Sequence, residues 1–129
     1  MMTLICGLPN AGKTTYSSQY GNVIHYDDVT APRGKHPIQV LCDMVSAMDD
    51  VCVEGVFISS HERKKIAQSY SGTRKVCVWL NTPLEECVRR ENRNRATCII
   101  NNCQALFQPP TCDEGWDEII VIGEQKWRI

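Results

Sequence analysis

Several features that would place this sequence in other protein classes are missing from it. No apolar run approaches the ~20 residues needed to cross a bilayer. The first residues lack the basic segment that opens a signal peptide, so we expect a cytoplasmic protein. The formal net charge is only −1, so no overall field would draw the chain to nucleic acid or to an anionic membrane. Any attraction to a polyanion must therefore come from a local patch.

Cysteine is abundant, with eight in 129 residues, but Cys-x-x-Cys pairs are absent. That absence argues against a zinc ribbon or a redox pair. Cysteines that fall in apolar strand or helix patterns are expected to be reduced and to act as small hydrophobic side chains; they are Cys6, Cys42, Cys52, Cys77 and Cys87. The other three, Cys98, Cys103 and Cys112, form a weaker candidate for a metal or redox site.

Short apolar segments alternate with helical patterns along the chain. Strands are predicted over residues 3–6, 23–26, 51–53, 75–80 and 118–122. Helices are predicted over about residues 13–20, 60–70 and 100–107, and two further helices are predicted to begin at residues 37 and 83. Ser59 to Glu62 and Thr82 to Glu85 both have the spacing of a capping box. Uniformly apolar strands between helices predict a parallel sheet covered on both faces. The predicted fold class is α/β, a three-layer αβα domain spanning residues 1–129 with a five-stranded parallel sheet.

The segment from Gly7 to Thr14 matches the phosphate-binding pattern G-x-x-x-x-G-K-[ST] at every position. It lies directly after the first predicted strand and directly before a helix, as a P-loop requires. The loop amides then point at phosphates from the positive end of the helix, and the lysine charge lies on the β- and γ-phosphates. We predict that ATP is bound by this loop and that Mg²⁺ is bound by the Thr14 hydroxyl. The predicted nucleotide-binding residues are Leu8, Pro9, Asn10, Ala11, Gly12, Lys13, Thr14 and Thr15, with Lys13 also catalytic.

The rest of the sequence distinguishes among P-loop proteins. The Asn-Lys-x-Asp motif, which usually recognises the guanine base in guanine-selective GTPases, is absent. Motor-type ATPases need a longer core and usually an acidic pair after the third strand, where this chain has the single carboxylate of Glu54. These absences favour a small kinase-type P-loop protein. Glu54 is a candidate for ordering magnesium-bound water, against an equally weighted structural role.

Asp27 and Asp28 follow the second predicted strand, at the sheet edge where α/β folds bind ligands. A carboxylate there can accept the proton of an acceptor hydroxyl during phosphoryl transfer. The alternative is a helix-capping or turn aspartate, and we expect one of the two to have that role. Asp27 is favoured as the general base.

Arginines without lysines crowd the end of the helix predicted from residue 83, at positions 89, 90, 93 and 95. Arg89 and Arg93 would share a helical face at i, i+4 spacing. A solvated basic face is the alternative, but planar guanidinium groups suit bidentate phosphate contacts. We predict an arginine-bearing lid over about residues 89–107, with Arg89 and Arg93 as catalytic residues. For Arg63 the sequence leaves open whether its side chain faces substrate or solvent.

Taken in order, these segments resemble a known family. The sequence is similar to the kinase domain of polynucleotide 5′-kinases and their zeta-toxin-like relatives. The similar segments are the P-loop, the Asp27-Asp28 pair, the arginine-rich segment 88–93 and the segment 107–121, which contains Pro-Pro and Glu-Gly-Trp-Asp-Glu stretches. The resemblance implies ATP and Mg²⁺ as cofactors, with Asp27 as general base. Where that family often has an arginine that holds the acceptor phosphate, this chain has Thr30, and Arg33 is the nearest substitute.

The function predicted from the sequence is an ATP- and Mg²⁺-dependent kinase that transfers the γ-phosphate to an alcohol group. The favoured acceptor is a polynucleotide end, DNA or RNA, or a modified nucleic-acid component. A small-metabolite or nucleoside kinase is the enzymatic alternative. A hypothesis of another class is an ATP-binding switch or partner protein with little turnover.

Overall fold

Five parallel strands form the centre of the molecule. The computed structural model describes residues 1–123, and the last six residues of the predicted 1–129 domain lie outside the described part. The strands are β1 (Met2–Gly7), β2 (Val23–His25), β3 (Val51–Glu54), β4 (Lys75–Leu80) and β5 (Glu118–Ile122). They lie side by side in the order β2-β3-β1-β4-β5, and every neighbouring pair is parallel. The predicted five-stranded parallel sheet is confirmed.

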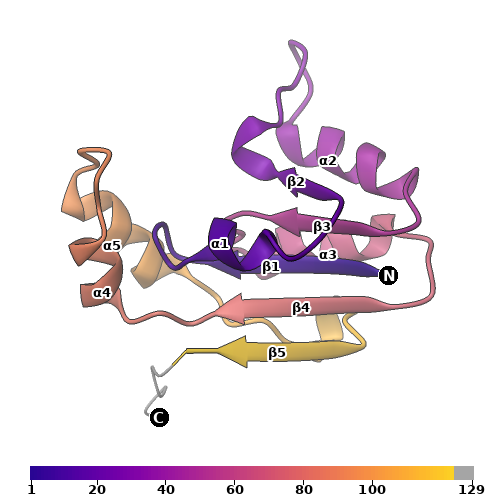
Figure 1. Ribbon diagram of the computed structural model, residues 1–129. Helices are drawn as coiled ribbons and strands as arrows, with labels where there is room; N and C mark the ends of the chain where they lie inside the picture. The colour runs from indigo at the N-terminus through magenta and orange to yellow at the C-terminus, as the bar shows by residue number, and fades with distance from the viewer. Residues whose placement is uncertain (124–129) are drawn as a thin grey trace.

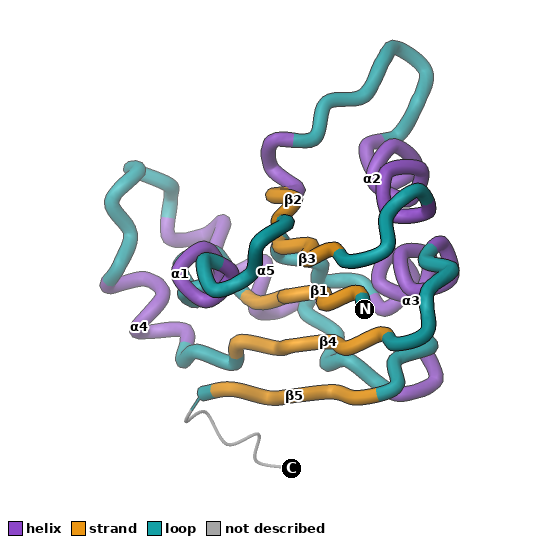
Figure 2. The backbone as a smooth tube through the Cα atoms, turned by 45° about the vertical axis from the view of Figure 1, so that its right-hand side comes forward, coloured by secondary structure: helices purple, strands orange, loops and turns teal. Residues whose placement is uncertain are grey.

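Helices flank this sheet on both faces and beyond one end (Figures 1 and 2). The helices are α1 (Lys13–Ser17), α2 (Pro37–Ser46), α3 (Ser60–Ser69), α4 (Leu84–Arg89) and α5 (Thr97–Leu106), with short 3-10 turns η1 (Tyr26–Asp28) and η2 (Cys112–Glu114). In Figure 1, α1 lies in front of the sheet and α3 behind it, and α2 packs against α3. All strands run toward α4 and the start of α1, so the loops that follow their carboxyl ends gather on that side.

The central strands are apolar at almost every position because both sheet faces are covered. Every residue of β1 and β3 is buried, and so are all of β4 after its first residue. Helix α2 shows the complementary pattern: its core-facing positions Ile38, Leu41, Cys42 and Val45 are buried, and the positions between them are mostly exposed. None of the described helices is long and apolar enough to cross a membrane.

All eight cysteines lie in the described part, and none is disulfide-bonded. The five expected in the core are buried, and burial raises the pKa of the Cys52 thiol to about 12. The sulfur atoms of Cys6 and Cys77 lie 4.0 Å apart, and this contact together with burial raises the pKa of Cys77. Cys98 and Cys112 are exposed, and no metal-binding group of three or more ligating side chains exists within residues 1–123.

Two expectations about helix ends are wrong. Helix α4 ends at Arg89, with Arg90 as its C-cap, so Arg93 lies outside the helix and does not share a helical face with Arg89. The capping box expected at Thr82 does not form, because Pro83 is the N-cap and the Thr82 hydroxyl instead donates to the carbonyl of Ala11 (2.7 Å). At α3, by contrast, the Ser59 side chain accepts the backbone amide of Glu62, as the sequence predicts.

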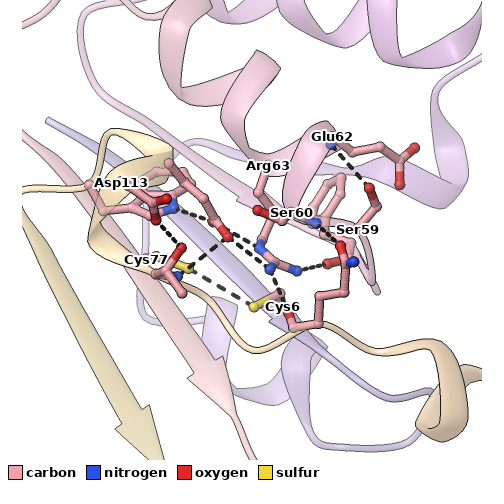
Figure 3. A network of polar contacts seen from close by, with 12 residues as sticks. Cys6, Ser59, Ser60, Glu62, Arg63, Cys77 and Asp113 are labelled. Atoms are coloured by element: carbon pink, nitrogen blue, oxygen red, sulfur yellow. Dashed lines mark hydrogen bonds and ion pairs between the residues drawn. The ribbon is translucent and has the colours of Figure 1, made fainter.

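Arg63 faces neither substrate nor solvent but is fully buried beneath α3 (Figure 3). Its guanidinium donates two parallel hydrogen bonds to the carboxylate of Glu114, both 3.0 Å long. Further hydrogen bonds go to the carbonyls of Phe57 and Gln108. The indole of Trp116 donates to the same carboxylate (2.9 Å). This ion pair fastens the segment that leads into β5 against α3, which explains why a charged residue is tolerated in the interior.

Candidate active site

An open cleft of about 820 Å³ lies at the carboxyl edge of the sheet. The phosphate-binding loop with the start of α1 lines it, together with the segments at the carboxyl ends of β2, β3, β4 and β5 and the segment that follows α4. Pro9 to Thr15, Asp27, Glu54 and Arg93 all contribute to its walls. Residues that the sequence predicted separately are thus brought together, as expected for the carboxyl edge of an α/β sheet.

The backbone of the phosphate-binding loop depends on glycine at two positions. A Cβ atom at Gly7 would lie 2.8 Å from the carbonyl oxygen of Leu80 and 3.2 Å from the side chain of Ala11. Gly12 is the N-cap of α1 and has a left-handed backbone (φ 103°), which other residues rarely adopt. The glycines of the pattern are therefore required by contact with β4 and by the turn into the helix.

Lys13 is the first residue of α1 and is buried in the loop that precedes it. Its ammonium group donates to the carbonyls of Gly7 (3.0 Å) and Leu8 (2.7 Å). Burial lowers the pKa of Lys13, and the nearby carboxylates of Glu54 and Asp27 oppose that effect. The lysine charge is thus held at the floor of the cleft, where it can contact a phosphate.

Asp27 and Glu54 form an acidic wall of the cleft. Asp27 lies in η1 directly after β2, and its exposed side chain lines the cleft, whereas Asp28 does not line it. Glu54 ends β3, and its carboxylate lies 2.6 Å from the Nδ1 atom of His25 on the neighbouring strand. Thr14, at the second position of α1, is exposed on the same cleft. Hard oxygen ligands of this kind suit Mg²⁺, so the donor set fits the predicted metal.

The arginines after residue 88 divide into two groups. Arg90, Arg93 and Arg95 line the cleft, and Arg93 makes no side-chain hydrogen bond or ion pair within residues 1–123. Arg89 does not line it: its side chain is 71% exposed and pairs with Glu86 one turn earlier on α4. This contact lowers the pKa of Glu86 to about 2. The structure therefore brings Arg93 to the candidate site but leaves Arg89 on the outer surface of α4.

Sequence reasoning missed two residues next to the loop. Thr82 lines the cleft and binds the loop carbonyl of Ala11, but its spacing had indicated a helix cap. Glu91 contacts the loop side chain of Asn10 (2.8 Å), and no motif singled it out. Of the resemblance-based positions, Arg33 is exposed in the loop before α2 and does not line the cleft. No local sequence pattern could have signalled the two missed contacts, because each joins segments more than 70 residues apart.

Comparisons with known proteins support the fold. No protein-family model matches the sequence, and no curated protein matches it significantly. Among solved structures, the fold is similar to a sugar kinase from Janibacter sp. HTCC2649 (TM-score 0.74, 15% identity, 95% of this chain and 84% of that one). It is also similar to a gluconokinase from Sinorhizobium meliloti 1021 (TM-score 0.67, 13% identity, 95% and 81%). A fungal RNA kinase has a TM-score of 0.66 at 14% identity, covering 99% and 76%. The chain therefore has a P-loop kinase fold.

Proposed function

We propose that this protein is an ATP- and Mg²⁺-dependent phosphotransferase that moves the γ-phosphoryl group to a hydroxyl acceptor. The observation that carries the proposal is that the phosphate-binding loop, from Pro9 onward, and Asp27 line one cleft. The loop supplies a site for the donor phosphates, and Asp27 supplies a base in the same cleft. The similarity of the fold to kinases agrees with a cleft that holds both a phosphate donor and a hydroxyl acceptor.

The transfer step assigns a role to each of these groups. The acceptor oxygen forms a bond to the γ-phosphorus while the bond from that phosphorus to the β-γ bridging oxygen breaks and ADP leaves. Asp27 accepts the proton of the acceptor hydroxyl, which prepares the oxygen for attack. Lys13, buried at the cleft floor, stabilises the negative charge on the β- and γ-phosphates.

Thr14 and Glu54 would hold Mg²⁺, the first by its hydroxyl and the second through water. The bound ion supplies charge neutralisation at the phosphate oxygens. His25 contacts the Glu54 carboxylate at 2.6 Å and so fixes its orientation on the cleft wall.

Arg93 is the arginine best placed to act on the transferred group. It lines the cleft, and its guanidinium has no other partner within the described residues, so it can bind a phosphoryl oxygen without breaking an ion pair. Arg90 also lines the cleft, but it already contacts Glu86 and the carbonyl of Asn10. We therefore assign the lid function to Arg93 first and Arg90 second. Arg89 is paired on the outer face of α4 and is assigned no catalytic role.

Two classes of acceptor fit this chemistry. A polynucleotide end is supported by the resemblance of the sequence to polynucleotide 5′-kinases and by the similar fold of the RNA kinase. A small hydroxyl compound is supported by the acidic character of the wall around Asp27 and Glu54, since acceptor phosphates would be repelled there. The cleft arginines Arg90, Arg93 and Arg95 all lie on the lid side, and the remaining cleft cation, Lys13, lies in the phosphate-binding loop.

The deciding experiment is transfer of labelled γ-phosphate from ATP to a panel of acceptors. The panel contains 5′-hydroxyl oligonucleotides, plain and modified duplexes, nucleosides and neutral sugars. Asp27→Asn should lower transfer about 10²- to 10⁴-fold, the usual contribution of a general base, with ATP affinity unchanged. Asp28→Asn, a matched change in the same 3-10 turn but outside the cleft, should leave transfer within about twofold.

The outcome of the panel also separates the hypotheses. Label on small molecules alone would reject the polynucleotide acceptor. ATP binding without transfer to any acceptor, together with no effect of Asp27→Asn on any activity, would favour the ATP-binding switch and refute the proposed kinase.

A further inference from the structure

Glu91 lies where the segment after α4 meets the phosphate-binding loop, and the chemistry proposed above gives it no role. Its side chain is only 11% exposed. The Oε1 atom accepts hydrogen bonds from the Asn10 side-chain amide (2.8 Å) and from Arg95 Nε (3.0 Å). The Oε2 atom accepts the backbone amides of Arg93 (2.9 Å) and Arg95 (3.0 Å). A single carboxylate thus binds two side chains and two backbone amides.

Asn10 completes the connection from the side of the loop. Its side-chain amide also donates to the carbonyl of Cys87 (3.1 Å), and its side-chain oxygen accepts from Arg95 Nη2 (3.0 Å). The residue has a left-handed backbone (φ 69°), which asparagine tolerates better than most residues. Its side chain is therefore committed to the segment after α4, although its backbone belongs to the phosphate-binding loop.

The contacts of Asn10, Glu91 and Arg95 close a ring that spans more than 80 residues of sequence. Arg93 lies between two members of this ring, in a segment that forms neither helix nor strand. Its backbone amide is held by Glu91 and not by regular secondary structure. The direction in which the Arg93 side chain enters the cleft consequently depends on the ring.

We propose that Glu91 and Asn10 are positioning residues that hold Arg93 over the phosphate-binding loop for phosphoryl transfer. The inference rests on the proposed function. A group that stabilises a developing charge is effective only when it is held in place beforehand, and a displacement of about 1 Å can cost about 100-fold in rate. The hydrogen bond from Asn10 and those from the backbone of residues 93 and 95 lower the pKa of Glu91 to about 2. The carboxylate therefore stays charged at neutral pH.

Glu91→Ala, Glu91→Gln and Asn10→Ala test this inference in the full chain. Glu91→Ala should lower kcat about 10- to 100-fold while the Kd for ATP changes less than about threefold. Glu91→Gln retains one oxygen acceptor of the two and should lose less. Because Asn10 and Glu91 act through one ring, the double alanine variant should lose little more than the single ones. Glu62→Ala is the matched control, since its carboxylate makes no hydrogen bond or ion pair within residues 1–123.

Amide hydrogen exchange gives a readout that does not need turnover. Removing the Glu91 carboxylate should speed exchange of the Arg93 and Arg95 amides by about tenfold or more, with the β1 and β4 amides unchanged. If no acceptor supports transfer by the wild type, the proposed function fails. Amide exchange and ATP affinity, both measured without turnover, still show whether Glu91 holds the backbone of residues 93 and 95. Unchanged kcat and exchange in Glu91→Ala, or equal losses of kcat and ATP affinity, would overturn the positioning role. Should Glu91→Ala fail to fold, Glu91→Gln, which leaves the loop sequence intact, must lower kcat more than ATP affinity and speed exchange of the Arg93 and Arg95 amides.

Discussion

Removing one partner of the buried Arg63–Glu114 pair should be among the most damaging single changes in the molecule. The two side chains are 0% and 1% exposed, so neither charge can turn to water when the other is lost. In Glu114→Ala the Arg63 guanidinium keeps two carbonyl acceptors but loses its counter-ion, and the Trp116 indole loses its acceptor. Breaking a buried pair in this way costs about 3–5 kcal/mol. For a chain of this length, that cost lowers Tm by about 10–20 °C.

The assay is thermal and urea unfolding in reducing buffer, with Glu118→Ala as the matched control. Glu118 also pairs with an arginine, Arg74 at 2.6 Å, but both side chains are about half exposed. The control should therefore cost no more than about 1 kcal/mol. Equal and small losses for Glu114→Ala and Glu118→Ala would refute the reasoning that burial decides the effect.

The same pair predicts a reversal of the pH dependence of stability. Burial raises the pKa of Glu114, but the hydrogen bonds from Arg63 and Trp116 outweigh burial and leave it below its ordinary value. In the wild type this group therefore adds stability above its unfolded pKa of about 4.3, which is lost as pH falls through the lower folded pKa. Arg63→Met removes the largest of the effects that lower the Glu114 pKa, both hydrogen bonds and the charge of Arg63, while those from Trp116, Ser60 and the Thr111 amide remain, so burial should raise the Glu114 pKa. In Arg63→Met the contribution of Glu114 to the free energy of unfolding should then fall as pH rises above about 4.3. Urea unfolding of the wild type and of Arg63→Met between pH 4 and 8 measures this. The same pH dependence of stability in the two proteins would contradict this account.

Three further outcomes follow from the cleft. Arg93→Ala should cut kcat about 10³-fold or more, as for other phosphoryl-transfer arginines, and leave ATP affinity nearly unchanged. Arg89→Ala should change kcat less than about threefold. Equal effects of the two substitutions would reject the lid assignment. Gly7→Ala places a Cβ 2.8 Å from a β4 carbonyl oxygen, so it should cost about 1–3 kcal/mol of stability and weaken ATP binding in calorimetric titration. Gly21→Ala is the control and should do neither, because a Cβ there would meet nothing within 4 Å. Thr82→Val removes the 2.7 Å hydrogen bond to the loop and should cost about 1–2 kcal/mol in urea unfolding; an unchanged midpoint would contradict that contribution.

The strand pattern and the phosphate-binding loop were predictable because they depend on residues close together in sequence. β4 and β5 have the predicted bounds. For β4 the reason is its apolar run, which leaves few alternatives in a covered parallel sheet, whereas β5 is a partly exposed edge strand. The loop was recognisable because its glycines and lysine have fixed spacing. Helix ends were less predictable: α4 ends at Arg89, and the Thr82 hydroxyl binds the loop and not its own helix. Both outcomes result from contacts with segments distant in sequence.

Sequence by itself determined that the protein has a parallel sheet and a loop able to bind nucleotide phosphates. The tertiary structure alone decided which charged side chains meet at that loop. It makes Asp27 part of the cleft wall and leaves Asp28 outside it, although the two are adjacent and chemically identical. It buries Arg63 against Glu114, 51 residues away, and joins Glu91 to Asn10 across 81 residues. Local patterns specify backbone conformation, but the partner of a polar side chain is specified only when distant segments pack together.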